Sequence, residues 1–427
     1  MDKKKISNIL TIGFALFAMF FGAGNLLLPP FIGVTVGSNF IIAMIAFGLT
    51  GILLPFTGIL SVIQSGENFK DLGNRINPYI ASVLGTIIMV CIGPLIAIPR
   101  TAATTFEVGL KPFFPEMNPL WGSLIFFVIT LGLAIRPSKV VDVIGNYLTP
   151  FLLVLLALLI VCGILNPIDT LHSTEQTMMQ SFSLGFIEGY QTLDVLASVI
   201  FAGIIISAAK AKGYEDSKSK TQVTIISGAL SSVCLLFVYG GLIYLGATSG
   251  VTDPEIKRSD LLIHISKGIL GQYGLIAIAA CMAFACLTTA ISLTSAVGTF
   301  FSELFNNKVG YTAMTIVCTV ISFILSVKGV DEIIKFAYPP LVFVYPIVIT
   351  LVLYIVIFGK TITAKAPYIG AIVASTIIGL LSLLKLLGCF SDDMVEQLNI
   401  IPFFENDLGW IVPSIIGFGI GFLFKKK

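Results

Sequence analysis

The chain has 427 residues, of which 56% are hydrophobic and 11% are charged, and its mean hydropathy is +1.00. A soluble globular domain carries about 25% charged residues, so this composition excludes a soluble protein and predicts one that lies in a bilayer. The formal net charge of +2 gives no indication of nucleic-acid binding.

Apolar segments recur along the whole chain, and most contain the roughly 20 residues that a helix needs to cross a bilayer. We therefore expect an all-α integral membrane protein with twelve transmembrane helices, of which the fourth, ninth and last are short. The hydrophilic gaps are too brief for a soluble domain, so residues 1–427 are expected to form a single membrane domain. The expected spans are about 7–36, 40–64, 79–108, 120–135, 140–165, 178–209, 221–247, 274–302, 311–327, 336–358, 366–388 and 409–424.

The positions of the lysines and arginines predict the orientation of these spans. With the N-terminus inside, 17 of the 25 basic residues lie in expected cytoplasmic segments, 7 lie on the opposite side, and Arg100 lies within a span. Cytoplasmic segments carry the excess of lysine and arginine in membrane proteins. We therefore expect a multi-pass protein of the cell membrane with both termini in the cytoplasm.

The first span carries helix-disrupting residues near its midpoint. Gly22 and Gly24 are followed by Asn25 and by the pair Pro29–Pro30. Glycine costs roughly 1 kcal/mol in a helix interior and proline about 3 kcal/mol. Unpaired backbone groups are tolerated at this depth only where protein or a water-filled cavity surrounds them. We therefore expect Gly22–Asn25 to be the unwound centre of a broken helix and a candidate binding site.

The sixth span repeats this pattern. Gly185–Asp194 contains two glycines, two carboxylates, a glutamine and a threonine, near the midpoint of a segment from about Met178 to Lys210. The two breaks lie five spans apart, so the interrupted helices cross the bilayer in opposite directions. Topology alone thus predicts a five-plus-five inverted repeat, with repeat one over about 7–165, repeat two over about 178–358 and two extra helices over about 366–424.

Two breaks side by side have a definite chemistry. Each half-helix leaves free N–H groups at one end and free carbonyl groups at the other. The N–H groups and the positive end of the helix dipole suit a carboxylate, and the carbonyls suit an ammonium group or Na⁺. The pattern therefore favours a site for a zwitterionic amino acid, with a cation beside it. In the alternative interpretation, the glycines only permit close helix packing.

Four stretches of the sequence together resemble the bacterial branched-chain amino acid:cation symporter family, and the likeness covers nearly the whole chain. They are Phe21–Pro30 (FGAGNLLLPP), Ile92–Ala102 (IGPLIAIPRTA), Gly185–Asp194 (GFIEGYQTLD) and Cys286–Ile291 (CLTTAI). The resemblance implies one membrane transport domain with a fold similar to the bacterial leucine transporter (LeuT) type, with ten core helices plus two. It also implies uptake of leucine, isoleucine and valine coupled to Na⁺, or to H⁺ in some interpretations, across a bacterial plasma membrane.

The same resemblance implies roles for individual residues. The substrate carboxylate would be held by the first break, and its amine by carbonyls of the second. The corresponding substrate-binding residues are Gly22, Ala23, Gly24, Asn25, Gly189, Tyr190, Gln191 and Thr192. A Na⁺ site would join span 1 to span 8 through the carbonyls of Ala18, Phe21 and Ala285 and the hydroxyls of Thr288 and Thr289. The last three lie one helical turn apart on one face, and Na⁺ prefers oxygen ligands.

Some polar residues have more than one interpretation. Asn25 either contacts the substrate or caps the second half-helix. Thr288 and Thr289 either bind the cation or hydrogen-bond to carbonyls one turn back or to a neighbouring helix. Both alternatives stay open.

Charged residues within spans are costly and therefore mark candidate functional sites. Glu188 and Asp194 flank the second break, and either one pairs with the substrate amine, relays a proton or caps a half-helix. We favour capping for Asp194, because acidic side chains suit a helix N-terminus. Arg100 and Glu107 lie two turns apart on span 3 and form either a structural ion pair, which we favour, or a gate latch.

We therefore expect a secondary active transporter that imports branched-chain amino acids with Na⁺ by alternating access, with no cofactor beyond the coupling ion and no obligate protein partner. The alternatives are proton-coupled symport, with Glu188 as the titrating group, and transport of another small amino acid or amine. A channel or a sensor with the same fold is a further alternative. We do not expect an enzyme, because His172 and His264 fall in expected outer loops and no HExxH or GxSxG motif occurs.

Overall fold

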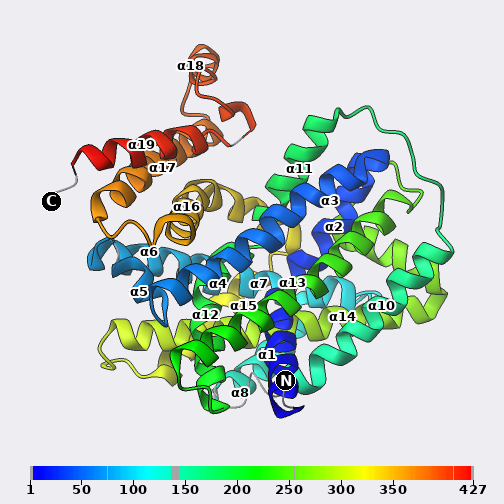
Figure 1. Ribbon diagram of the computed structural model, residues 1–427. Coiled ribbons are helices and arrows are strands. Elements are labelled where there is room, and N and C mark those ends of the chain that lie inside the picture. Colours follow the sequence, from blue (N-terminus) through cyan, green and yellow to red (C-terminus); the bar gives the residue numbers. More distant parts are fainter. Residues whose placement is uncertain (1–2, 75, 136–143, 254, 407, 425–427) are drawn as a thin grey trace.

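The computed structural model describes residues 3–74, 76–135, 144–253, 255–406 and 408–424. All regular elements among these residues are helices, which confirms the expected all-α class (Figure 1). Eight of the described helices are long and apolar enough to cross a membrane, and three shorter apolar helices accompany them. The chain is thus a multi-pass membrane protein. The count of twelve spans stays a prediction, since expected spans 1 and 6 are each divided between two helices.

The helices of the first half of the chain correspond in order to the first five expected spans. They are α1 (Lys3–Phe20), α2 (Ala23–Val36), α3 (Phe40–Gly48), α4 (Leu54–Ser65), α5 (Phe69–Asn74), α6 (Pro78–Val90), α7 (Ala97–Thr104), α8 (Pro119–Ala134) and α10 (Thr149–Leu165). Between them lie the 3₁₀ turn η1 (Gly37–Asn39) and the π-helical segments η2 (Leu49–Leu53), η3 (Cys91–Leu95), η4 (Thr105–Leu110) and η6 (Ile144–Leu148).

The second half of the chain contains longer helices and the two peripheral ones at the C-terminal end. They are α11 (Met178–Tyr190), α12 (Asp194–Ala211), α13 (Ser217–Ala247), α14 (Arg258–Leu304), α15 (Tyr311–Ser326), α16 (Val330–Phe358), α17 (Lys365–Leu386), α18 (Asp392–Leu398), the 3₁₀ turn η7 (Phe404–Asn406) and α19 (Ile411–Leu423). In α14 the helical winding is interrupted at Gly271, whose φ is +60°.

Several helices begin where the sequence supplies a cap. Asn118 accepts a hydrogen bond from the Leu120 amide at the start of α8, and Pro119 occupies the first turn. Thr177 and Gln180 form a reciprocal capping box at the start of α11. Such caps satisfy amides that have no acceptor within the helix.

The two divided spans lie in the interior of the bundle. Helix α1 packs against α13, α2 against α13 and α14, α11 against α3, and α12 against α4. The pair α17 and α19 packs together at one edge, next to α16, with α18 beyond it (Figure 1). The ends of α1 and α11 and the starts of α2 and α12 therefore meet away from lipid.

Candidate functional site

The first interruption lies between α1 and α2. Helix α1 ends at Phe20 and α2 begins at Ala23, and Gly22 between them has an extended backbone. The Gly22 amide donates a hydrogen bond of 3.2 Å to Asn25 Oδ1. We expected the unwound centre to extend over Gly22–Asn25, but it covers only Phe21 and Gly22. Winding resumes at Ala23 because the Asn25 side chain caps the new helix.

The second interruption lies between α11 and α12. Helix α11 ends at Tyr190 and α12 begins at Asp194, so the non-helical residues are Gln191–Leu193. Leu193 adopts the left-handed conformation with φ of +68°, which is uncommon for a branched residue and is found where surrounding packing enforces it. The Thr192 hydroxyl donates a 2.8 Å hydrogen bond to the Gly189 carbonyl and thereby covers part of the helix end.

Buried side-chain hydrogen bonds connect the two interruptions. Asn25 Nδ2 donates to Asp194 Oδ2 at 2.7 Å and is also in contact with the Tyr239 hydroxyl of α13. Tyr239 in turn donates to Asp194 Oδ2 at 3.3 Å. We favoured a capping role for Asp194, but its carboxylate bonds to α2 and α13 instead of to its own helix. The reason is that Asn25 and Tyr239 offer side-chain donors at the same position.

Arg100 of α7 reaches the second interruption. Its Nη1 donates to the Gln191 carbonyl at 2.8 Å, and its side chain is only 3% exposed. Among the described residues, Arg100 and Glu107 do not form the expected ion pair. Glu107 instead accepts a 3.0 Å hydrogen bond from the Val330 amide. The π-helical winding of η4, which contains Glu107, changes the angular spacing between the two side chains.

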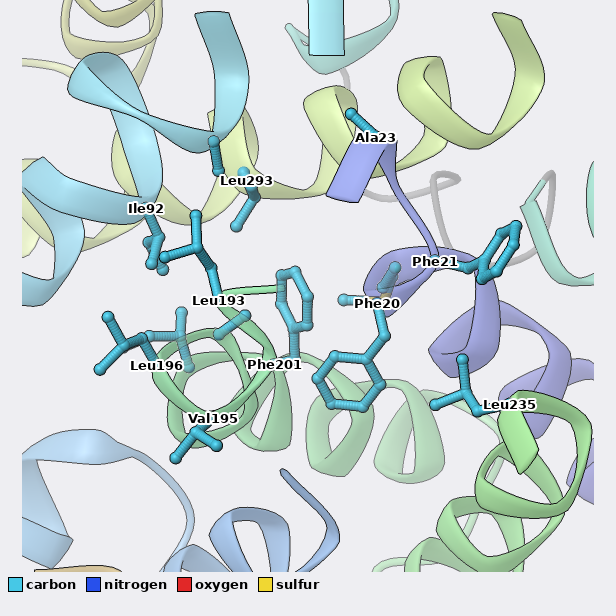
Figure 2. Packing of buried hydrophobic residues seen from close by; sticks show 14 of the residues in the cluster. Phe20, Phe21, Ala23, Ile92, Leu193, Val195, Leu196, Phe201, Leu235 and Leu293 are labelled. Carbon is cyan, nitrogen blue, oxygen red and sulfur yellow. The ribbon is translucent and has the colours of Figure 1, made fainter. Parts of the chain in front are cut away.

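A small cavity of about 20 Å³ lies between the two interruptions, with room for about one water molecule. Its polar wall includes Gly22, Asn25, Arg100, Thr101, Thr192, Asp194 and Thr289. Its apolar wall consists of Met19, Phe20, Ala23, Ile92, Ala97, Leu193, Ala197, Phe201 and Leu293. Figure 2 shows Phe20 at the end of α1 facing Phe201 of α12, and their ring centroids lie 5.6 Å apart.

The expected substrate-binding residues are divided between two places. Gly22, Ala23, Asn25 and Thr192 line the cavity, and Gly24 lies directly behind it, against Arg100. The other three do not line it.

Gly189, Tyr190 and Gln191 are not among the residues that line this cavity. A Cβ at Gly189 would collide with Thr50, so this glycine permits close packing of α11 against η2. The Tyr190 ring stacks on Tyr345 of α16 with centroids 4.6 Å apart. Tyr190 and Gln191 both line a separate small cavity next to α16.

The oxygen atoms expected to hold a cation lie together where α1 contacts α14. Thr288 Oγ1 donates to the carbonyls of Ala18 and Ala285, each at 3.0 Å. Thr289 Oγ1 donates to the carbonyls of Ala18 at 3.2 Å and Met19 at 3.3 Å. Phe21, the fifth expected ligand, is fully buried one turn further along. These bonds agree with the interpretation in which the two threonines hydrogen-bond to a neighbouring helix. The same hydroxyl and carbonyl oxygens are also the kind of ligand that a hard cation prefers.

A partly buried ion pair lies near the C-terminal end of α11, close to the second interruption. Arg258 Nη2 donates to Glu188 Oε1 at 2.9 Å, and the guanidinium carbon lies 4.4 Å above the centre of the Phe31 ring of α2. Glu188 is therefore neutralised by Arg258 and does not line the cavity. Within the described part of the chain, no group of three or more His, Cys, Asp or Glu residues is placed to hold a metal ion.

Sequence reasoning missed several residues at this site. Tyr239 lies inside an ordinary apolar span, and the aromatic and aliphatic residues of the cavity wall look like any other membrane-helix residues. Arg100 was singled out by its charge but assigned to the wrong partner. For this residue, the position of a charge within a span was the signal that pointed to a functional site.

Comparison with known proteins gives consistent results over the whole chain. A family model described as "Branched-chain amino acid transport protein" matches residues 5–427. The branched-chain amino acid permease BrnQ of Bacillus subtilis is 35% identical over 99% of this chain and 98% of its own length. The branched-chain amino acid permease BraB of the same organism is 34% identical over 98% of this chain and 95% of its own length.

Solved structures with low sequence identity share the fold. A nucleobase-cation-symport-1 family transporter in a closed conformation superposes with a TM-score of 0.64 at 12% identity, covering 97% of this chain and 92% of that one. A Na⁺-coupled sialic acid symporter superposes with a TM-score of 0.61 at 13% identity, covering 97% of this chain and 90% of that one. At these identities the likeness concerns the fold alone.

Proposed function

Because the chain belongs to the branched-chain amino acid transport protein family, we propose that it imports leucine, isoleucine and valine by symport with Na⁺. The family is one of permeases, so the chain is a transporter and not an enzyme. The observation that carries the proposal is the junction of the two interrupted spans. There, the N-terminus of α2, the non-helical residues before α12 and the Thr289 hydroxyl of α14 surround one buried cavity.

The proposal includes the topology expected from the sequence. Spans 1 and 6 would be the broken helices of a LeuT-like five-plus-five inverted repeat within twelve transmembrane helices, with both termini in the cytoplasm. The end of α1 at Phe20 and the start of α12 at Asp194 support this, because both residues line the shared cavity. The likeness to the fold of two symporters supports it as well. In this fold class, binding sites lie at broken helices near the bilayer midplane.

The substrate would occupy a widened form of the small cavity. Its carboxylate would meet the amides at the start of α2, at Ala23 and Gly24, where helix N-termini favour anions. Its apolar side chain would lie among Phe20, Phe201 and Leu293. One methylene in such a pocket contributes only about 1–3 kcal/mol, so leucine, isoleucine and valine should compete with one another. Since the cavity has room for about one water, substrate entry requires the walls to separate.

Sodium would bind to the carbonyls of Ala18, Phe21 and Ala285 and the hydroxyls of Thr288 and Thr289. The short distances from both hydroxyls to the Ala18 carbonyl support this set. A cation there would tie α1 to α14 and order the neighbouring break. Proton coupling is the alternative, and its best carboxylate is Asp194 rather than Glu188, because Glu188 is paired with Arg258.

The first test concerns the coupling ion. We expect reconstituted protein to accumulate radiolabelled leucine under an inward Na⁺ gradient, and to lose this accumulation when K⁺ replaces Na⁺ at fixed pH. Thr289→Val should raise the Na⁺ concentration for half-maximal uptake by roughly tenfold to a hundredfold, since removing one ligand of a charged group costs about 1.5–3 kcal/mol.

The matched control is Thr130→Val. This threonine is fully buried in α8 and bonds to the carbonyl of Phe126 in its own helix, far from the cation set in the chain. Its Na⁺ dependence should equal that of the wild type. Uptake that does not depend on Na⁺ but depends on a proton gradient would contradict sodium coupling and would identify the proton as the coupling ion.

A further inference from the structure

Arg100 is a buried charge whose hydrogen bonds are incomplete. Its side chain is 3% exposed, Nη1 donates to the Gln191 carbonyl at 2.8 Å, and Nε has no hydrogen-bond partner. A buried polar group without a partner costs free energy, and an arginine within a span costs more. A purely structural arginine would have its donors satisfied by the protein. Arg100 instead lines the cavity with its Nε donor unpaired.

The guanidinium of Arg100 lies against the first turn of α2. A Cβ built on Gly24 would lie 2.7 Å from Nη2 and 3.2 Å from Cζ, so glycine at this position leaves the space that the guanidinium fills. The first amides of α2 have no acceptor within the helix, and the positive end of the helix dipole adds to the guanidinium charge. Two independent sources of positive potential therefore converge on one wall of the cavity.

The negative charge of the cavity is Asp194. Its carboxylate is 3% exposed and lines the same cavity. Asn25 and Tyr239 fix its position through Oδ2. The ion pairs among the described residues do not include Arg100 with Asp194. The other buried charges of this region, Glu188 and Arg258, neutralise each other. One positive and one negative group thus face a shared space without direct contact.

We propose that Arg100 and Asp194 form a zwitterion clamp, in which Arg100 binds the α-carboxylate of the substrate and Asp194 its α-ammonium group. This assignment rests on the proposed amino acid transport and names the side chains that recognise the substrate backbone. The planar guanidinium suits a carboxylate because it offers two parallel donors. The clamp also selects against amines without a carboxylate and against carboxylic acids without an amino group, since each leaves one buried charge unpaired.

The test compares ligands that lack one charge. Binding to purified full-length protein is measured for L-leucine, L-leucinamide and 4-methylpentanoate, at about pH 6.5, where the α-amino groups stay protonated. The wild type should bind leucine at least roughly 30-fold more tightly than either analogue. Arg100→Gln should weaken the affinity for leucine by that factor and should leave the affinity for leucinamide within about twofold of the wild-type value. The preference for leucine over leucinamide should therefore disappear. Asp194→Asn should remove the preference for leucine over 4-methylpentanoate instead.

The control is Arg258→Gln, which removes a partly buried arginine that does not line the cavity. It should alter the affinities for leucine and leucinamide by one common factor. Should the Arg100→Gln protein aggregate, Arg100→Lys can replace it. Lysine retains the positive charge but lacks the two parallel N–H donors of the guanidinium, so it should still lower the preference for leucine over leucinamide. A preference that stays at the wild-type value in both Arg100 variants would show that Arg100 only supports Gln191, and would overturn the clamp. Absence of leucine binding in the wild type would instead overturn the proposed function.

Discussion

Asn25 connects three helices through a single amide group. Its Oδ1 accepts from the Gly22 amide and so starts α2, while its Nδ2 donates to Asp194 of α12 and contacts Tyr239 of α13. The sequence left open whether Asn25 caps a helix or contacts substrate. The structure shows the cap and also places Asn25 on the wall of the cavity. One residue therefore fixes the geometry of both interruptions.

We expect Asn25→Ala to lower the stability of the protein by about 1–3 kcal/mol or more, because it leaves the buried Asp194 carboxylate with one donor fewer and removes the α2 cap. The measurement is thermal unfolding of purified protein in detergent. Asn8→Ala is the matched control, since Asn8 of α1 is half-buried and donates a hydrogen bond to the Tyr214 hydroxyl. Equal midpoints for the two variants would contradict this role for Asn25.

At the residue scale, the sequence predicted which polar residues matter better than it predicted their partners. Gly22, Asn25, Thr192 and Thr289 all line the cavity, because helix-breaking or polar residues inside a span have few other uses. Their partners come from helices far away in the chain. No local pattern relates Arg100 to Gln191 or Asn25 to Tyr239, so these contacts could not be predicted.

At the scale of elements, α2 and α13 approach each other closely enough for their backbones to touch. A Cβ at Gly246 would collide with the Pro30 carbonyl, and one at Gly33 would collide with the Ile243 carbonyl and lie 2.6 Å from the Ala247 amide. Small residues allow such contact in membrane helices, where packing rather than hydrophobic exclusion drives association. The glycine-packing interpretation thus holds for this pair, outside the breaks.

Gly246→Ala is expected to destabilise the bundle by about 1–3 kcal/mol or more, since the atoms it meets belong to the backbone and cannot rotate away. Gly132→Ala in α8 is the control, because nothing lies within 4 Å of its added methyl group. That control should be neutral or slightly stabilising. The stability of both variants is measured by the folded fraction after gel filtration and by the midpoint of thermal unfolding. A Gly246→Ala protein as stable as the control would contradict the close contact.

The ends of the elements were harder to predict than their existence. The first expected break included Gly22–Asn25, whereas only Phe21 and Gly22 are non-helical, since the Asn25 cap competes successfully with the glycines. The second expected break began at Gly185, whereas α11 continues to Tyr190 because Gly185 and Gly189 serve its packing against α3 and η2. In both cases tertiary contacts outweighed the intrinsic cost of glycine in a helix.

Considered as a whole, the molecule closes the cavity from two directions. The Glu188–Arg258 pair joins α11 to α14 on the expected outer side. On the expected cytoplasmic side, Glu67 after α4 binds both Lys210 of α12 and Lys220 of α13. A larger cavity of about 370 Å³ lies beside Glu67, between the ends of α4 and α12 and the start of α13. These are the segments that must separate for release into the cytoplasm under the proposed orientation.

The hydrogen bonds from Lys210 and Lys220 lower the pKa of the Glu67 carboxyl below its ordinary value of 4.5. A lowered pKa means that the charged form stabilises the closed arrangement. The contribution is complete above the ordinary value and is lost as the pH falls through the lowered one. Since the Glu67 side chain is 45% exposed, solvent screening limits the contribution to about 1 kcal/mol or less.

We therefore expect Glu67→Gln to speed leucine efflux from proteoliposomes by up to about fivefold, the factor that 1 kcal/mol represents. The increase should be constant from pH 8 to about pH 5 and should shrink below the ordinary value, because wild-type Glu67 then becomes protonated and loses the same interaction. Glu303→Gln, which breaks the exposed pair with Lys70 and spares the larger cavity, should change efflux less than twofold. An equal acceleration in both variants would indicate a general loss of surface charge pairing. An unchanged rate in Glu67→Gln would contradict a role of the two Glu67 ion pairs in holding the cytoplasmic side closed.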